Sequence, residues 1–245
     1  MALTNEEIVI CNLALGQVGE YQITSSATST KQYELCERYY DEVVKDVLSD
    51  HTWNEAKKRA YLVEEADAPV FGFSYRFELP SDLIKVIRIG DGENDYEFWE
   101  VENGYILTNL AQSPLSYAVG DKYAAGQYIS YGSVTYEVIT GFTATDWTTD
   151  LANLLTTSGD YAVLKIEYIY NLTDTTKWSV RLKNAIAEQL AIKVSVGITN
   201  DPKTKYDLVN QYESLTIRKA RSADAQQGRV RPITNSTWWR SRFGR

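Results

Sequence analysis

The sequence predicts an α+β protein: mainly an α-helical bundle of four helices, with an antiparallel β excursion, a small inserted β module and an extended C-terminal arm. Three observations lead to this prediction. Apolar residues recur with helical period near both ends of the chain, they alternate with period two in the middle, and the last residues follow neither pattern. We expect a core of residues 1–111 and 161–228, an inserted module of residues 112–160 and an arm of residues 229–245.

Two helices are expected near the start of the chain. Thr4 to Glu7 has the form of a capping box, in which the Thr4 hydroxyl accepts from the Glu7 amide while the Glu7 carboxylate reaches back. The inner face of this first helix is then Ile8, Cys11, Leu15 and Val18. The second helix ends near His51, and its apolar stripe is Tyr33, Cys36, Tyr40, Val43, Val44 and Val47.

Two further helices are expected near the end. Helical period returns over residues 178–194, and Asn200-Asp201-Pro202 supplies a cap and a first-turn proline for the last helix. The same period predicts that the last helix buries Tyr206, Val209, Tyr212 and Leu215. These four helices are expected to pack together, bringing the two ends of the chain side by side.

The middle of the chain reads as strands and turns. Residues 71–79 alternate between apolar and polar, and residues 84–89 and 164–170 are apolar enough for further strands of the same sheet. Residues 96–107 have the pattern of a hairpin. Inside the inserted module, residues 128–131 and 135–139 predict a second hairpin that turns at Gly132-Ser133.

Composition narrows the possible functions. The chain has 245 residues, 44% of them hydrophobic, and a net charge of −8, which is typical of an acidic globular protein. Because the basic residues concentrate at the C-terminal end, general nucleic-acid binding is not expected of the body. No apolar run is long enough for a membrane span, so no membrane partner is expected. Cys11 and Cys36 are expected to be reduced core residues of a protein made in the cytoplasm.

The residues needed for catalysis are sparse. His51 is the single histidine, which argues against His-based metal sites and catalytic triads, and no glycine-rich phosphate loop occurs. The acidic clusters Glu64-Glu65 and Asp91, Glu93, Asp95 fall on predicted loops, where we expect solvated charge. We therefore expect no enzyme, no cofactor and no metal. The alternative is a tail-associated hydrolase that cleaves cell-wall or surface polysaccharide with such carboxylates.

The C-terminal segment carries the strongest functional signal. From Arg218 onward it holds eight Lys or Arg residues and one acid, together with two tryptophans and a phenylalanine. Trp and Arg are the residues most enriched at interface hot spots, so we interpret the arm as a docking segment. A disordered basic terminus and a DNA-binding arm remain as alternatives. The expected docking residues are Arg229, Arg231, Trp238, Trp239, Arg240, Arg242, Phe243 and Arg245.

The order of several residue blocks resembles the tail tubular protein A, or head-to-tail adaptor, family of tailed bacteriophages. The blocks are Cys11 to Gly19, His51 to Ala60, Tyr75 to Asp82 with Val86 to Ile89, Tyr168 to Asp174 leading into Ala185 to Ala191, and Ala223 to Gln226. Together they cover residues 3–110 and 161–228, and the module of residues 112–160 departs from the compact family pattern.

The resemblance implies a virion protein of the neck and tail, assembled in the host cytoplasm. Members form a homo-oligomeric ring, commonly of twelve subunits, that docks under the portal protein and contacts a tail or nozzle protein below. The ring extends the channel through which DNA passes during genome ejection, without sequence-specific binding. The resemblance also implies that the C-terminal arm runs along the portal.

The inserted module has a second, weaker resemblance. Ala118 to Asp121 and Ser130 to Tyr136 resemble segments of small carbohydrate-binding modules. This resemblance implies that exposed aromatic side chains bind a sugar. The candidate ligand-binding residues of the module are Tyr131, Tyr136 and Trp147.

Overall fold

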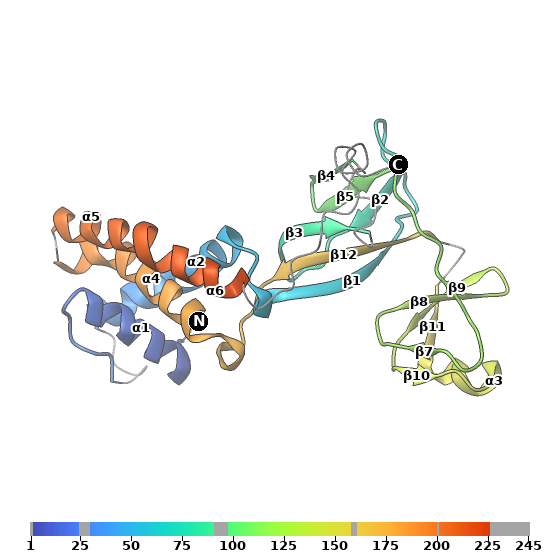
Figure 1. The fold of residues 1–245 in the computed structure, drawn as a ribbon, viewed down its shortest axis with the longest axis horizontal. Coiled ribbons are helices and arrows are strands. Elements are labelled where there is room, and N and C mark those ends of the chain that lie inside the picture. The colour runs from blue at the N-terminus through green and yellow to red at the C-terminus, as the bar shows by residue number, and fades with distance from the viewer. Residues whose placement is uncertain (1, 25–29, 91–97, 158–160, 200, 226–245) are drawn as a thin grey trace, which may run out of the picture. The chain divides into compact units, whose positions relative to one another are not determined.

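The computed structural model describes residues 2–24, 30–90, 98–157, 161–199 and 201–225 (Figure 1). The chain folds into two compact units. The helical unit comprises the described residues of Met1–Val47, Trp53–Glu55 and Asp174–Arg245, and the β unit comprises those of Leu48–Thr52 and Ala56–Thr173. The three-part division expected from the sequence stays a prediction.

Helix α1 (Asn5–Gln17) begins at the predicted capping box. The Thr4 amide donates to Glu7 Oε2 at 2.7 Å, and the Glu7 amide donates to Thr4 Oγ1 at 3.3 Å. These bonds satisfy amides that have no partner within the helix. The predicted inner face is confirmed for Ile8, Cys11 and Leu15, which are buried. Val18, the C-terminal cap of α1, is half-buried.

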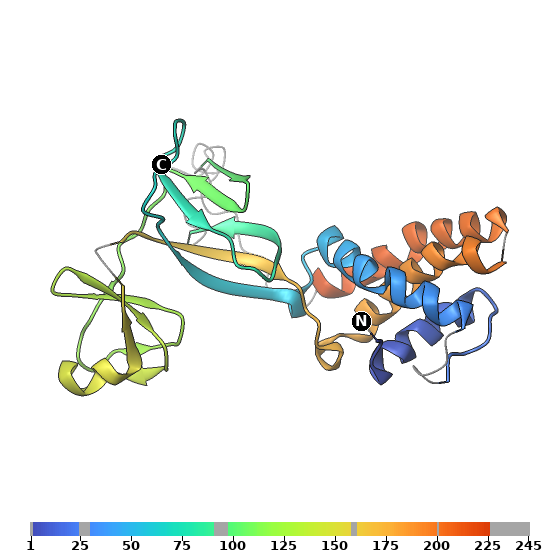
Figure 2. The same ribbon diagram turned by 180° about the vertical axis from the view of Figure 1, so that it is seen from behind.

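Helix α4 (Val180–Thr199) is the centre of the helical unit. It contacts α1 and also α5 (Pro202–Gln211), and Figures 1 and 2 show α1 on one side of it and α5 on the other. Nine of its residues are buried, and three of these are alanines, which let neighbouring backbones approach closely. A helix buried around most of its circumference needs partners on several sides.

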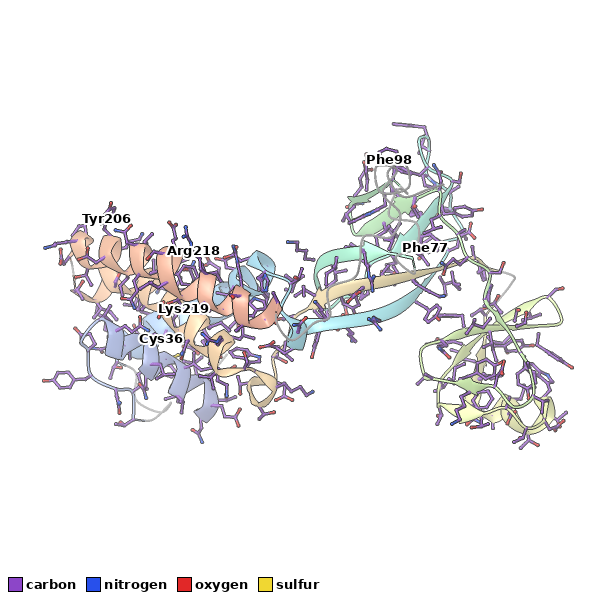
Figure 3. The ribbon with its side chains drawn as sticks, in the orientation of Figure 1. Cys36, Phe77, Phe98, Tyr206, Arg218 and Lys219 are labelled. Atoms are coloured by element: carbon purple, nitrogen blue, oxygen red, sulfur yellow. The ribbon has the colours of Figure 1, made fainter. Side chains whose placement is uncertain are left out.

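Helix α2 (Lys31–Asp50) also belongs to this core. Its predicted stripe is confirmed, since all six residues from Tyr33 to Val47 named above are buried. The Lys193 ammonium of α4 donates to Glu42 Oε1 of α2 at 2.7 Å, an ion pair at the rim of the contact. Cys36 of α2 and Cys11 of α1 are both buried free cysteines (Figure 3), as predicted.

The last predicted helix is two helices joined by a π-helical turn. α5 is followed by the turn Tyr212–Thr216 and by α6 (Ile217–Ala225). A π turn takes more residues than an α turn, so Ile217 instead of Leu215 follows Tyr212 on the inner face. Tyr212 is buried as predicted, but Tyr206 and Leu215 are 68% and 50% exposed, so their predicted burial is wrong.

The β unit contains a three-stranded antiparallel sheet of order β1-β12-β3. Its strands are β1 (Lys57–Val63), β12 (Val163–Tyr170) and β3 (Leu83–Ile89). The predicted strands at residues 84–89 and 164–170 are therefore confirmed. β1 was not predicted, because its three leading basic residues hide the apolar alternation of a strand.

A second sheet of order β2-β5-β4 shares the core of the β unit. Its strands are β2 (Tyr75–Glu78), β5 (Tyr105–Thr108) and β4 (Trp99–Glu102). Phe77 of β2 is fully buried (Figure 3) and packs in one cluster with Ile106 and Leu164. The predicted strand at residues 71–79 is shorter than expected, since Phe71 is 85% exposed and lies before β2.

The inserted module contains two more small sheets. The first has the order β11-β9-β8-β6, and the second pairs β10 with β7. The predicted hairpin is confirmed as β8 (Tyr128–Tyr131) and β9 (Val134–Val138), and Gly132 and Ser133 both adopt positive φ at its turn. The other elements are β6 (Leu115–Ser116), β7 (Lys122–Tyr123), β10 (Phe142–Thr143), α3 (Trp147–Asp150) and β11 (Leu154–Thr156).

The prediction of a mainly α-helical bundle of four helices is wrong. The described residues form five helices of nine residues or more, and the strands form four small sheets instead of one excursion. The helical period of the last quarter is split by the π turn, and the strands of the middle were too short to reveal their number. Strand-rich structure therefore makes up much more of the protein than the sequence pattern indicated.

The capping box gives a direct test of the helical unit. We expect Thr4→Ala to lower its free energy of unfolding by about 1 kcal/mol, because the Glu7 amide loses its acceptor, Thr4 Oγ1. Thr4→Ser keeps the accepting oxygen and should stay close to wild type. Urea unfolding followed by far-UV circular dichroism measures both, and an equal loss in the two variants would contradict the capping role.

Candidate functional site: an aromatic cluster in the inserted module

Of the two groups of predicted site residues, the structure describes only the one in the inserted module. The expected docking residues lie outside the described residues, and their role stays a prediction; they are Arg229, Arg231, Trp238, Trp239, Arg240, Arg242, Phe243 and Arg245. The three candidate residues of the module, Tyr131, Tyr136 and Trp147, are described, and they lie in contact with one another.

These side chains form an aromatic cluster together with Tyr117. The rings of Tyr131 and Trp147 are stacked, with centroids 3.9 Å apart and planes 19° from parallel. Tyr136 and Tyr117 each meet Trp147 edge-on, both with centroids at 4.9 Å. Stacked and edge-on contacts of this kind are the favoured geometries for aromatic pairs. Trp147 is therefore enclosed by three tyrosines.

Strand register and a helix cap position the cluster. Tyr136 pairs with Ile129, two residues before Tyr131 on the neighbouring strand, so the two tyrosine side chains lie diagonally on one face of the hairpin. Trp147 is the first residue of α3, and Asp146 caps that helix by accepting from the Thr149 amide at 3.3 Å. The sequence predicted the hairpin but gave no signal for α3, which has only four residues.

Tyr117 was missed at the sequence level. It follows the two-residue strand β6, which is too short to show the alternation of a strand. In the structure its hydroxyl donates to Asp150 Oδ2 at 2.7 Å. Burial and this carboxylate raise the pKa of Tyr117 to about 12.

Asp150 is a buried carboxylate whose oxygens are occupied by donors. Besides the Tyr117 hydroxyl, it accepts from the Thr145 amide at 2.8 Å and from the Thr145 hydroxyl at 3.3 Å. The Tyr117 hydrogen bond, followed by the bonds from Thr145, outweighs burial and lowers the pKa of Asp150. With these donors on its two oxygens, Asp150 ties Tyr117 to the loop at Thr145.

The cluster leaves one aromatic surface open to solvent. Tyr131 covers one face of Trp147, and Tyr117 and Tyr136 meet it edge-on, so Trp147 itself is only partly accessible. Tyr131 is 46% exposed and is the ring on which a sugar or another flat apolar face can stack. The geometry thus brings the three candidate residues together, and ligand binding by them stays a prediction.

A second concave feature lies within the helical unit. The Asn54 amide donates to Asp224 Oδ1 at 2.9 Å, and the Asn54 side chain donates to the Asp224 carbonyl at 2.7 Å. The Ser179 amide donates to Glu55 Oε1 at 3.2 Å, at the start of α4. These contacts tie down the end of α6, and they border a cavity of about 120 Å³ lined by Trp53, Glu55, Ser179, Val180, Arg181, Ala220, Ala223 and Asp224.

No helix within residues 2–24, 30–90, 98–157, 161–199 and 201–225 has the length and apolar character to cross a bilayer. Over those ranges, no group of three or more His, Cys, Asp or Glu side chains is placed to hold a metal ion.

No protein-family model matches the sequence, and no curated protein sequence matches it either.

The Tyr117–Asp150 bond predicts a pH-dependent module. Because the folded-state pKa of Asp150 is lowered, its contribution is present above the unfolded pKa of about 4 and is lost as pH falls further. Tyr117→Phe removes a donor to the Asp150 carboxylate and should destabilise the module at pH 7 and do so less in acid. Hydrogen exchange of the β8–β9 peptide across pH measures this.

Tyr128→Phe is the matched control, because the side-chain donors to Asp150 in the described part of the chain are Tyr117 and Thr145. Its exchange rates should follow the wild-type pH profile. Equal protection of the hairpin in wild type and Tyr117→Phe at every pH would show that the Asp150 network does not stabilise the module.

The open ring of Tyr131 predicts where a ligand stacks. We expect Tyr131→Ala to abolish binding of any oligosaccharide that a glycan array identifies, because it removes the exposed stacking surface. Tyr136→Phe keeps the edge-on contact with Trp147 and should bind as wild type does. Undiminished binding by Tyr131→Ala would place the ligand elsewhere.

Proposed function

We propose that this protein is a structural head-to-tail connector of a bacteriophage virion. In this proposal it forms a ring of subunits that docks under the portal protein, extends the DNA channel toward the tail, and carries out no catalysis. The proposed location is the neck of the virion, with a tail or nozzle protein below the ring. Assembly takes place in the host cytoplasm.

The observation that carries the proposal is the C-terminal segment. Five arginines, two tryptophans and a phenylalanine are concentrated in residues 229–245, after an otherwise acidic chain. Arg and Trp are suited to docking on a partner, because they combine a large contact area with charged or polar hydrogen-bond donors. The segment continues from α6, whose end is held by the two Asn54–Asp224 hydrogen bonds.

Two further arguments support the same function. The order of the residue blocks resembles the adaptor family along residues 3–110 and 161–228. A ring built of acidic bodies would also repel DNA, which favours sliding of the genome through its channel. A ring multiplies arms that are individually weak, so the joint gains strength by avidity.

Truncation of the arm tests the proposal. We expect full-length protein to join the portal ring of its own virus in a stoichiometric complex, and a chain ending at Gln227 to lose that association, as measured by native mass spectrometry. Trp238→Ala with Trp239→Ala should weaken the complex about 30-fold or more, because buried tryptophans contribute 2 kcal/mol or more at hot spots.

The matched control keeps the charge of the arm and changes its geometry. Arg240→Lys with Arg242→Lys should reduce binding less than the double tryptophan variant does. If neither full-length nor truncated protein associates with the portal, the proposed function is wrong. Tight, salt-dependent DNA binding that disappears on truncation would instead identify a DNA-binding arm.

A further inference from the structure

Helix α1 exposes apolar side chains on the face that points away from the helical unit. Val9 and Leu13 are 60% and 47% exposed and lie four residues apart, so they form one stripe along α1. The opposite face buries Ile8, Cys11 and Leu15. A helix that is apolar on both faces is typically covered on both. We call Val9 and Leu13 the α1 stripe.

A second stripe lies along α5 and α6. The buried residues Leu208, Tyr212 and Ile217 mark the face of these helices that packs inside the helical unit. Residues midway between them in the sequence lie on the opposite, outer side. Tyr206 and Leu215 are exposed on this outer side, and the exposed residues Arg218 and Lys219 follow Leu215 by three and four residues on α6 (Figure 3 labels Tyr206, Arg218 and Lys219). We call these last four residues the α5–α6 stripe.

The π turn creates this second stripe. Leu215 follows Tyr212 by three residues, and in an unbroken α-helix this spacing would place both side chains on the same buried face. The π turn Tyr212–Thr216 moves Ile217 into the inner position and leaves Leu215 half exposed. Single π turns occur frequently at functional sites. A local departure from regular helix thus presents an apolar side chain to solvent next to two cations.

The two stripes lie on opposite sides of the helical unit. α4 contacts both α1 and α5, and it lies between them in the two views of Figures 1 and 2. One symmetric contact between two copies would cover the same stripe on both and leave the other stripe exposed. Two unlike stripes on opposite sides fit a head-to-tail contact, which generates a ring when the rotation closes.

The charges beside the stripes are complementary. Glu6 precedes Val9 by three residues on α1, and Arg218 and Lys219 follow Leu215 by three and four residues. If Val9 packs on Leu215 with the helices antiparallel, Glu6 comes next to these two cations. Opposite charges at the edge of an apolar contact favour one partner and one orientation.

We propose that the α1 stripe of one copy packs antiparallel against the α5–α6 stripe of the next copy, head to tail around the ring. The occupant of each stripe is therefore a second copy of this chain. This inference rests on the ring in the proposed function and specifies its subunit contact.

Breaking one stripe at a time tests the contact in the full-length protein. Leu13→Glu and Leu215→Glu should each reduce ring formation about tenfold or more, by native mass spectrometry under conditions in which wild type forms rings, with the portal present. An equimolar mixture should give heterodimers, since each variant keeps one intact stripe. Leu155→Glu, at a 54% exposed residue of the module, is the control and should assemble normally.

Cysteine crosslinking gives a second readout that does not depend on those charge substitutions. Val9→Cys mixed with Leu215→Cys, and oxidised with copper phenanthroline, should give disulfide-linked dimers, and neither variant alone should do so. Dimers formed by one variant alone would show a symmetric contact and overturn the proposal. So would absence of dimers in the mixture, both with and without portal, or crosslinks to the portal itself.

The outcomes separate this inference from the proposed function. Crosslinked dimers in the mixture, together with no association of wild type with the portal, would uphold the contact and remove the connector function. Rings on the portal that form despite Leu13→Glu and Leu215→Glu, and without crosslinks, would uphold the connector and overturn the contact.

Discussion

The helical unit depends on the need to cover α4. This helix buries nine residues around most of its circumference, and its exposed residues, such as Val180 and Val196, lie near its two ends. α1, α2 and the α5–α6 pair supply the cover, and each uses only one face to do so. The outer faces of α1, α2 and the α5–α6 pair are therefore the surfaces through which the unit can contact a partner. Exposed apolar residues on α1 and α5–α6 follow directly from the way α4 is enclosed.

Much of the local structure was predictable because it is encoded by neighbouring residues. The capping box of α1, the stripe of α2, the strands β3 and β12 and the turn at Gly132-Ser133 all follow from short-range patterns. The fold class was not predictable in this way. A π turn adds one residue without a signature in the sequence, and strands of two residues are too short to show a period.

The candidate site shows the same division. Tyr131, Tyr136 and Trp147 were named because the module resembles small carbohydrate-binding modules, and the structure places both tyrosine rings against Trp147. Tyr117 joins them through tertiary structure, because its hydroxyl reaches Asp150, which is 33 residues away in sequence. No local pattern links those two positions. The docking residues beyond Gly228 were recognised by composition alone, and their geometry lies outside the described residues.

The paired hydrogen bonds between Asn54 and Asp224 have a mechanical consequence. Asn54 reaches both the side chain and the backbone carbonyl of Asp224, which lies one residue before the end of α6. Tension applied to the chain after α6 would act on both bonds at once, so the helix end would resist peeling until they break together. In the proposed connector, the C-terminal segment would be under such tension during genome release. The clamp places the load on the helical unit instead of on the last turn of a single helix.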